Sequence, residues 1–141
     1  MMITLKNEIE IQIRSYKEAD FSSIHTLNEQ EAWSNLVKKK DDAKAAWNHS
    51  NIAYVAIVDD KIIGYIRGIT DQSITLFICE LLIDQTYRGL GVGQELLYYV
   101  HSLYPTTRVE MLASSTSQTY YENKGFRPFY GFRKTFAEWN R

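Results

Sequence analysis

A short glycine-rich segment, residues 88–93 with the sequence RGLGVG, stands directly before an apolar helical pattern. The backbone N–H groups at the start of a helix have no intrahelical acceptor, and the helix dipole favours an anion there. Glycines allow a phosphate to come close to the backbone, and Arg88 can add a charge-assisted hydrogen bond. The segment predicts an anion site in which the glycines leave room for phosphate. A plain strand-to-helix turn is the alternative that these residues leave open.

Two familiar nucleotide-binding patterns are excluded by the residues themselves. A Walker phosphate loop requires Gly-Lys-Ser/Thr, whereas this segment continues Gly93-Gln94-Glu95. A Rossmann fingerprint requires a third glycine at the position that Leu96 occupies. The anion site must therefore be of another kind.

A second motif, YYENKGF at residues 120–126, follows one predicted strand later. In order and spacing the two motifs together resemble the signature of the GNAT acetyltransferase superfamily, Arg-x-x-Gly-x-Gly and then Tyr-x-x-x-Gly-Phe. The matching residues are Arg88, Gly91 and Gly93 in the first motif and Tyr121, Gly125 and Phe126 in the second. The expected order of helices and strands resembles that fold over essentially the whole chain.

The resemblance implies an enzyme that transfers an acetyl group from acetyl-CoA directly to a primary amine of a small molecule or a peptide. It implies that the glycine segment holds the CoA pyrophosphate, that the end of the preceding strand pairs with the pantetheine arm, and that Tyr121 protonates the departing thiolate. Ser114 stands where the family commonly has a cofactor-binding asparagine. The implied cofactor-binding residues are Leu81, Leu82, Ile83, Arg88, Gly89, Leu90, Gly91, Val92, Gly93, Ser114 and Ser117.

The attacking amine must be neutral, so a base has to remove a proton from it near neutral pH. Glu80 is the first candidate, because it is a charge inside the apolar run FICELLI and burial would raise its pKa. The alternatives are that Glu80 pairs with an arginine or faces solvent. Glu31 is the second candidate, in the polar region that would border the acceptor.

The resemblance implies that the acceptor contacts the segment 27–51, which carries Glu29, Glu31, Trp33 and Trp47. These residues suit a cationic amine through charge and cation–π contact, and they equally suit surface acids and core tryptophans. A module of the same fold that binds acyl-CoA without catalysis is the alternative function. A plain structural α/β protein is the third.

The elements around these motifs predict an α/β (α+β) fold, in which an antiparallel meander leads into a parallel βαβ unit. The resemblance implies that the two parallel strands of this unit splay apart. Alternating or β-branched apolar runs predict strands over residues 9–14, 52–58, 62–69, 74–83 and 107–113. A capping box over 15–18 predicts the start of a helix, which Phe21, Ile24 and Leu27 continue at helical spacing. The stripe of Leu96, Leu97, Val100 and Leu103 predicts the helix after the glycines.

Towards the C-terminus, a short helix over 117–124 is expected to end at Gly125, and the segment 126–136 is expected to form one or two closing strands. The 141 residues predict a single domain, residues 1–141. The formal charge of −1 gives no indication of a nucleic acid partner. A homodimer is compatible with an exposed closing strand.

One cysteine, Cys79, allows no internal disulfide, and the sequence shows neither a signal peptide nor an apolar run long enough to span a membrane. We therefore expect a cytoplasmic protein with no membrane partner. The three histidines lack metal-ligand spacing, so no metal site is predicted.

Overall fold

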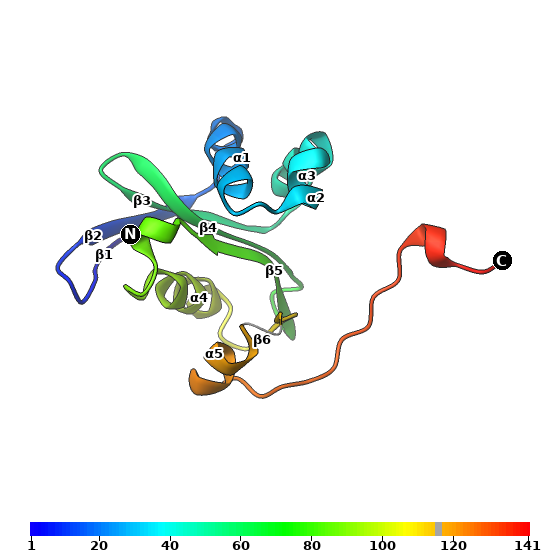
Figure 1. Ribbon diagram of the computed structural model, residues 1–141. Helices are drawn as coiled ribbons and strands as arrows, with labels where there is room; N and C mark the ends of the chain where they lie inside the picture. Colours follow the sequence, from blue (N-terminus) through cyan, green and yellow to red (C-terminus); the bar gives the residue numbers. More distant parts are fainter. Residues whose placement is uncertain (115–116) are drawn as a thin grey trace. The chain divides into compact units, whose positions relative to one another are not determined.

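The computed structural model describes residues 1–114 and 117–141 and forms two compact units, Met1–Glu110 and Met111–Arg141. Its described residues contain one mixed sheet with the strands in the order of the sequence (Figure 1). The strands are β1 (Met2–Thr4), β2 (Glu10–Ser15), β3 (Ile52–Val58), β4 (Lys61–Thr70), β5 (Thr75–Ile83) and β6 (Arg108–Met111).

Helices cover both faces of this sheet in the first unit. Three of them, α1 (Phe21–Gln30), α2 (Ser34–Lys38) and α3 (Lys40–His49), lie between β2 and β3 and stand on one side of the sheet in Figure 1. The fourth, α4 (Val92–Leu103), lies on the other side and packs on β3, β4 and β5. The second unit holds α5 (Gln118–Asn123), and the remaining short turns are the 3₁₀ helices η1 (Glu18–Asp20), η2 (Gln85–Tyr87) and η3 (Phe136–Glu138). No helix in the described part of the chain is long and apolar enough to cross a bilayer.

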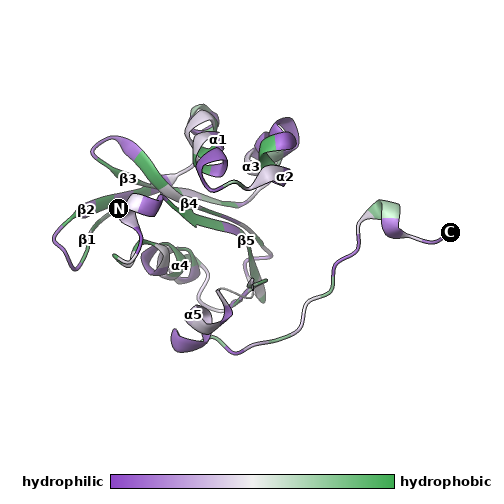
Figure 2. Ribbon diagram, viewed as in Figure 1, coloured by the Kyte–Doolittle hydropathy of each residue, from purple (hydrophilic) through white to green (hydrophobic). Residues whose placement is uncertain are grey.

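The first five strands pair antiparallel with their neighbours. Four of them, β2 to β5, form the predicted meander, whereas β1 was not predicted. β3 has the predicted bounds 52–58, and its β-branched residues make it one of the green strands of Figure 2. The hairpin from β3 to β4 turns at Asp59 and Asp60, both with left-handed backbone (φ 49° and 62°). This double left-handed pair is the geometry of a two-residue hairpin loop.

β6 runs parallel to β5, because the two strands start side by side. The N–H of Arg108, at the start of β6, donates to the carbonyl of Ile74, which directly precedes β5 (2.8 Å). The helix α4 connects them, so the predicted βαβ unit and the mixed fold are confirmed. β6 is four residues long, shorter than the predicted 107–113.

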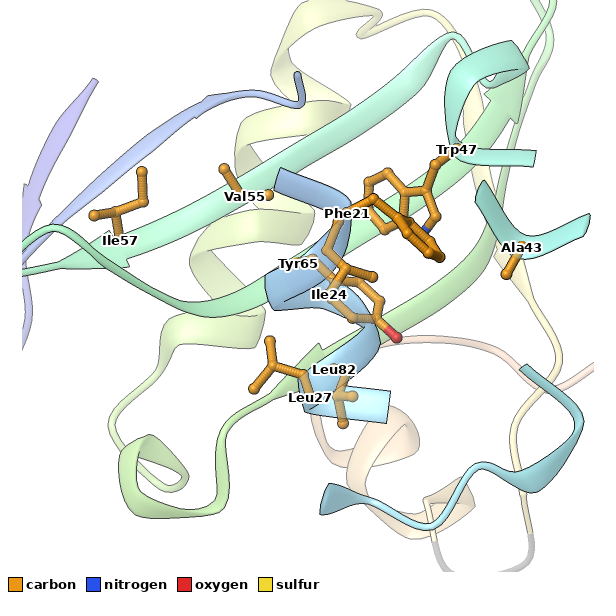
Figure 3. Packing of buried hydrophobic residues seen from close by; sticks show 9 residues of the cluster. All are labelled: Phe21, Ile24, Leu27, Ala43, Trp47, Val55, Ile57, Tyr65 and Leu82. Atoms are coloured by element: carbon orange, nitrogen blue, oxygen red, sulfur yellow. The ribbon is translucent and has the colours of Figure 1, made fainter. Parts of the chain in front are cut away.

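One hydrophobic core lies between the sheet and α1 and α3 (Figure 3). Phe21, Ile24 and Leu27 recur at helical spacing on α1 and are at most 5% exposed. Trp47 of α3 packs edge-on against Tyr65 of β4, with ring centroids 5.1 Å apart. This core fixes α1 over the first half of β4 and the second half of β5, where the candidate site lies.

Three local predictions are wrong. Ser15 ends β2 instead of capping a helix; the turn into α1 is held by Asp20, whose carboxylate accepts from the Lys17 N–H (2.7 Å) and from both Nη atoms of Arg14 (2.8 and 2.9 Å). Leu103 is 40% exposed at the end of α4, so of the four residues of the predicted stripe only Leu96, Leu97 and Val100 are buried.

The predicted closing strands are also not found, because the described residues 126–141 form no strand and only η3. A strand needs a partner for its N–H and C=O groups, and Pro128 lacks the donor. The aromatic residues of this segment stay exposed: Phe129, Tyr130, Phe132, Phe136 and Trp139.

Candidate active site

The start of α4 presents free backbone donors, as the glycine segment predicted. The N–H of Glu95 donates to the carbonyl of Gly91 (3.0 Å) and makes the first hydrogen bond of the helix. The preceding N–H groups, those of Val92, Gly93 and Gln94, therefore have no intrahelical acceptor. This end of the helix can accept an anion by dipole and by direct hydrogen bonds.

The three glycines of the segment differ in backbone conformation and in surroundings. Gly89 and Gly91 have left-handed backbone (φ 79° and 92°), which a residue with a Cβ adopts only at a cost. A Cβ at either position would meet no protein atom within 4 Å, so the space beside them is open. At Gly93 the Cβ would lie 3.8 Å from Leu81 and 3.9 Å from Ile83, on the side of the sheet. Room for an anion is therefore found at Gly89 and Gly91, whereas Gly93 faces the sheet.

Arg88 is fixed by two contacts beside this helix end. Its Nε donates to the carbonyl of Ile83 (3.0 Å), and its Nη2 donates to the carboxylate of Glu31. The Arg88 and Glu31 side chains are 42% and 30% exposed. Two residues that the sequence analysis assigned separately, one to the anion and one to the base, are thus joined in one ion pair.

The second half of β5 carries Leu81, Leu82 and Ile83. These residues pair with Ile66, Tyr65 and Gly64 of β4. Leu82 is buried in the core under α1, whereas Leu81 and Ile83 lie near Gly93 of α4. Because β5 and β6 start together and β6 is the shorter, this half of β5 extends beyond the end of β6. Its backbone is therefore the part of β5 available to an extended ligand.

Glu80 is held by Arg67 of β4, directly across the strand pair. Both carboxylate oxygens accept from the guanidinium, from Nε at 3.1 Å and from Nη2 at 2.9 Å. The third nitrogen, Nη1, donates to the Ser50 hydroxyl (3.0 Å). The Arg67 and Glu80 side chains are only 13% and 12% exposed. Pairing with an arginine was the alternative left open for Glu80, and the structure contains that pair; its role as a base stays a prediction.

Sequence reasoning missed Arg67 and a second buried polar pair beside it. The Tyr65 hydroxyl donates to Asn28 Oδ1 (2.5 Å), and both side chains are at most 1% exposed. Burial raises the pKa of Tyr65, and the negative charge of Glu80 raises it further. The sequence did contain a signal for Arg67. It is the one charge in the apolar run IIGYIRGI, and the predicted neighbouring strand has the apolar run FICELLI, whose one charge is Glu80.

Two cavities open on the side of the sheet covered by α1 and α3. One, of about 310 Å³, is lined by Glu31 together with Leu27, Gln30, Leu82 and Asp84 among others. The other, of about 440 Å³, includes Trp47 and Ser50 in its wall. The segment 27–51, which we expected to contact the acceptor, therefore contributes to both.

The second unit holds Tyr121 on α5. Its ring packs edge-on against Tyr120 (5.3 Å) and Phe126 (5.5 Å). Burial raises the pKa of Tyr121, which keeps its hydroxyl protonated at neutral pH. α5 ends as predicted, with Gly125 in left-handed backbone (φ 88°) after the C-cap Lys124.

Ser114 and Ser117 hold the entry to α5. The Ser114 N–H donates to Ser117 Oγ (2.9 Å), and the Ser117 N–H donates to the Ser114 carbonyl (3.1 Å). Both serines lie next to residues 115 and 116, which are outside the described part. Within the described part, no three His, Cys, Asp or Glu side chains are grouped so that they could hold a metal ion.

The described chain thus combines an antiparallel meander, a βαβ unit and a helix start with free backbone donors. The family model described as "Acetyltransferase (GNAT) domain" matches residues 13–137, and the chain belongs to this family. No match was found among curated proteins.

Solved structures share the fold at low sequence identity. The GNAT-family acetyltransferase SP0256 from Streptococcus pneumoniae TIGR4 superposes with a TM-score of 0.74 and 19% identity, over 89% of this chain and 97% of that one. A GNAT-family protein from Xanthomonas campestris pv. campestris superposes with a TM-score of 0.72 and 18% identity, over 89% of this chain and 93% of that one. Ard1 from Thermoplasma volcanium superposes with a TM-score of 0.63 and 20% identity, over 83% of this chain and 82% of that one.

Proposed function

We propose that the protein is an acetyl-CoA-dependent N-acetyltransferase that acts on a primary amine of a small molecule or peptide. The observation that carries the proposal is the start of α4. There, three N–H groups without an intrahelical acceptor, open space beside Gly89 and Gly91, and Arg88 together suit a pyrophosphate. The extended backbone of Leu81, Leu82 and Ile83 beyond the end of β6 supports a site for the pantetheine arm.

Acetyl-CoA, when bound, supplies the thioester whose carbonyl carbon the amine attacks. Tyr121 is proposed to donate its proton to the sulfur of the leaving thiolate, for which its protonated hydroxyl is suited. Glu80 or Glu31 is proposed to take the proton of the amine. A backbone N–H of the second half of β5 is proposed to stabilise the developing oxyanion. Ser114 and Ser117 are proposed to contribute to cofactor binding. The single cysteine supports a reducing compartment such as the cytoplasm.

One observation favours a second candidate, a module that binds acyl-CoA without catalysis. Both candidate bases, Glu80 and Glu31, are ion-paired with arginines, an arrangement that purely structural carboxylates share and that catalysis does not require. The two functions share cofactor binding and differ in amine-dependent release of free thiol.

Thermal unfolding with and without acetyl-CoA tests the shared part. A ligand at 100 times its Kd stabilises the folded state by about 2.7 kcal/mol, which raises Tm by roughly 8–12 °C in a chain of this size. An amine panel with a thiol-detecting reagent then separates enzyme from binding module. The absence of stabilisation at millimolar acetyl-CoA would exclude both candidates.

A further inference from the structure

The ion pair between Arg88 and Glu31 joins the anion site to the cavity under α1. Glu31 is the C-cap residue of α1, at the negative end of the helix dipole. A carboxylate at that end is unfavourable unless a cation accompanies it. In this structure the cation is Arg88, whose guanidinium also donates to the carbonyl of Ile83.

Arg88 is at the same time the cation directly before the glycine segment. A pyrophosphate at the start of α4 carries more charge than one carboxylate and forms charge-assisted bonds of the same kind with a guanidinium. Both partners are partly exposed, so the Arg88 side chain is free to leave Glu31 without disturbing the core. Glu31 would then stand without a cation at the end of its helix.

The cavity of about 310 Å³ is where a replacement cation would bind. Glu31 lines it together with Gln30 and the apolar side chains of Leu27 and Leu82. The other carboxylate in its wall, Asp84, already faces Lys61 (3.9 Å) and accepts from the Thr86 N–H. Glu31 is therefore the carboxylate in this cavity that cofactor binding would leave unpaired.

We propose that Glu31 binds an ammonium group of the acceptor, and that it becomes available when the cofactor withdraws Arg88. The acceptor class is then an amine with a second cationic nitrogen, such as a diamine or a basic side chain, and it binds after the cofactor. This inference rests on the proposed acetyl-CoA-dependent function and names its substrate class.

The first test measures binding by calorimetry, without turnover. The probe 1,4-diaminobutane is titrated into the wild-type protein with and without saturating CoA, and butylamine serves as the probe lacking the second cation. We expect the diamine to bind at least tenfold more tightly when CoA is present, and butylamine to gain less than twofold. Equal affinities of the diamine in the two titrations would overturn the inference.

The second test uses Glu31→Gln, which removes the charge and keeps the shape. The matched control is Glu10→Gln, the same change at an exposed position of β2. Because Glu31 competes for Arg88, the Glu31→Gln variant should bind acetyl-CoA about two- to fivefold more tightly than wild type. Its KM for diaminobutane should rise at least tenfold, while the Kd of acetyl-CoA and the KM for diaminobutane of the Glu10→Gln control stay within twofold of the wild-type values.

The outcomes separate the inference from the function on which it rests. If acetyl-CoA does not bind the wild-type protein, the proposed function fails and the inference fails with it. If acetyl-CoA binds and acetyl transfer occurs, but Glu31→Gln behaves as Glu10→Gln does, the function stands and the inference is wrong. Weaker acetyl-CoA binding by Glu31→Gln would also contradict it, since the carboxylate would then support the site instead of competing for Arg88.

Discussion

Replacing Arg67 by methionine should cost stability, because it leaves the Glu80 carboxylate without its partner. The guanidinium and the carboxylate approach to about 3 Å through two hydrogen bonds. At an effective dielectric constant of about 20 such a pair attracts with roughly 5 kcal/mol, part of which offsets the loss of water by both groups. With Glu80 only 12% exposed, water restores little when Arg67 is removed. We expect the free energy of unfolding to fall by about 3 kcal/mol.

The assay is urea unfolding followed by tryptophan fluorescence, since Trp47 lies in the core on the same face of the sheet. A domain of this length has a total free energy of unfolding of roughly 7–20 kcal/mol, so a loss of about 3 kcal/mol is large and measurable. The double variant Arg67→Met/Glu80→Leu removes both charges and should recover about 2 kcal/mol relative to Arg67→Met alone.

A double-mutant cycle of Arg67→Met and Glu80→Leu tests whether the two groups form a buried ion pair. If Arg67→Met costs under 1 kcal/mol and the coupling energy with Glu80 is near zero, the two groups are not a buried pair and solvent screens them. A Lys61→Met variant provides the control, because Lys61 faces Asp84 at 3.9 Å with a side chain that is 67% exposed. It should cost less than about 0.5 kcal/mol.

Four further predictions address the site and the pH dependence of stability. If Glu80 is the base, Glu80→Gln lowers kcat by about 10²-fold or more and removes the acidic limb of the pH–rate profile; an unchanged profile assigns it to the ion pair alone. Tyr121→Phe should lower kcat about 10²-fold while the Kd of acetyl-CoA stays within twofold, and wild-type turnover across the pH range would remove the donor role. Gly91→Ala should lower the free energy of unfolding, measured in urea, by about 1–2 kcal/mol because residue 91 has left-handed backbone. Gly93→Ala should leave it unchanged, because a Cβ at residue 93 makes only ordinary contacts. Equal losses in the two variants would contradict this prediction. The hydrogen bonds from Arg14 lower the pKa of Asp20 in the folded protein. The contribution of Asp20 to the free energy of unfolding is therefore full above pH about 4, the pKa in the unfolded chain, and is lost as the pH falls through the lower pKa of the folded state. Asp20→Asn should flatten the acid side of the curve of stability against pH, and an unchanged curve would refute this prediction.

The sequence predicted the sheet and the start of α4 because both depend on local patterns. A β-branched run such as 52–58 is bounded by residues that favour turns, and its bounds were found to the residue. The glycine segment combines a backbone requirement with a helix start, and Gly89 and Gly91 do adopt the left-handed conformation. These features need no knowledge of distant contacts.

The C-terminal segment shows the limit of local patterns. Aromatic residues such as Phe129 and Phe132 have high strand propensity, but propensity in strands depends on a partner and a face to bury. The described residues 126–141 form no strand, and Phe132 is 98% exposed. The contact between Arg88 and Glu31 was missed for the related reason that 57 residues separate the two side chains.

The position of Glu80 depends on one extra residue in β5. From Thr70 to Gly68, β4 pairs with Leu76 to Ile78 of β5 in continuous register, but Arg67 pairs with Glu80 and not with Cys79. The bulge at Cys79 thus shifts the ladder by one residue, and a one-residue shift moves side chains to the other face of a sheet. Without the bulge, Glu80 would stand opposite Ile66, on the face covered by α4.

The backbone of β4 has to allow this bulge, and Gly68 is the residue that does. A Cβ at Gly68 would lie 2.5 Å from the carbonyl oxygen of Phe77, which no side chain tolerates, so the strands approach there only because the residue is glycine. Gly68 and the bulge together place Glu80 on the same face of the sheet as Arg67 and Tyr65. The charge in FICELLI could be recognised from the sequence, but the face on which it lies is decided by the pairing of two strands around this glycine.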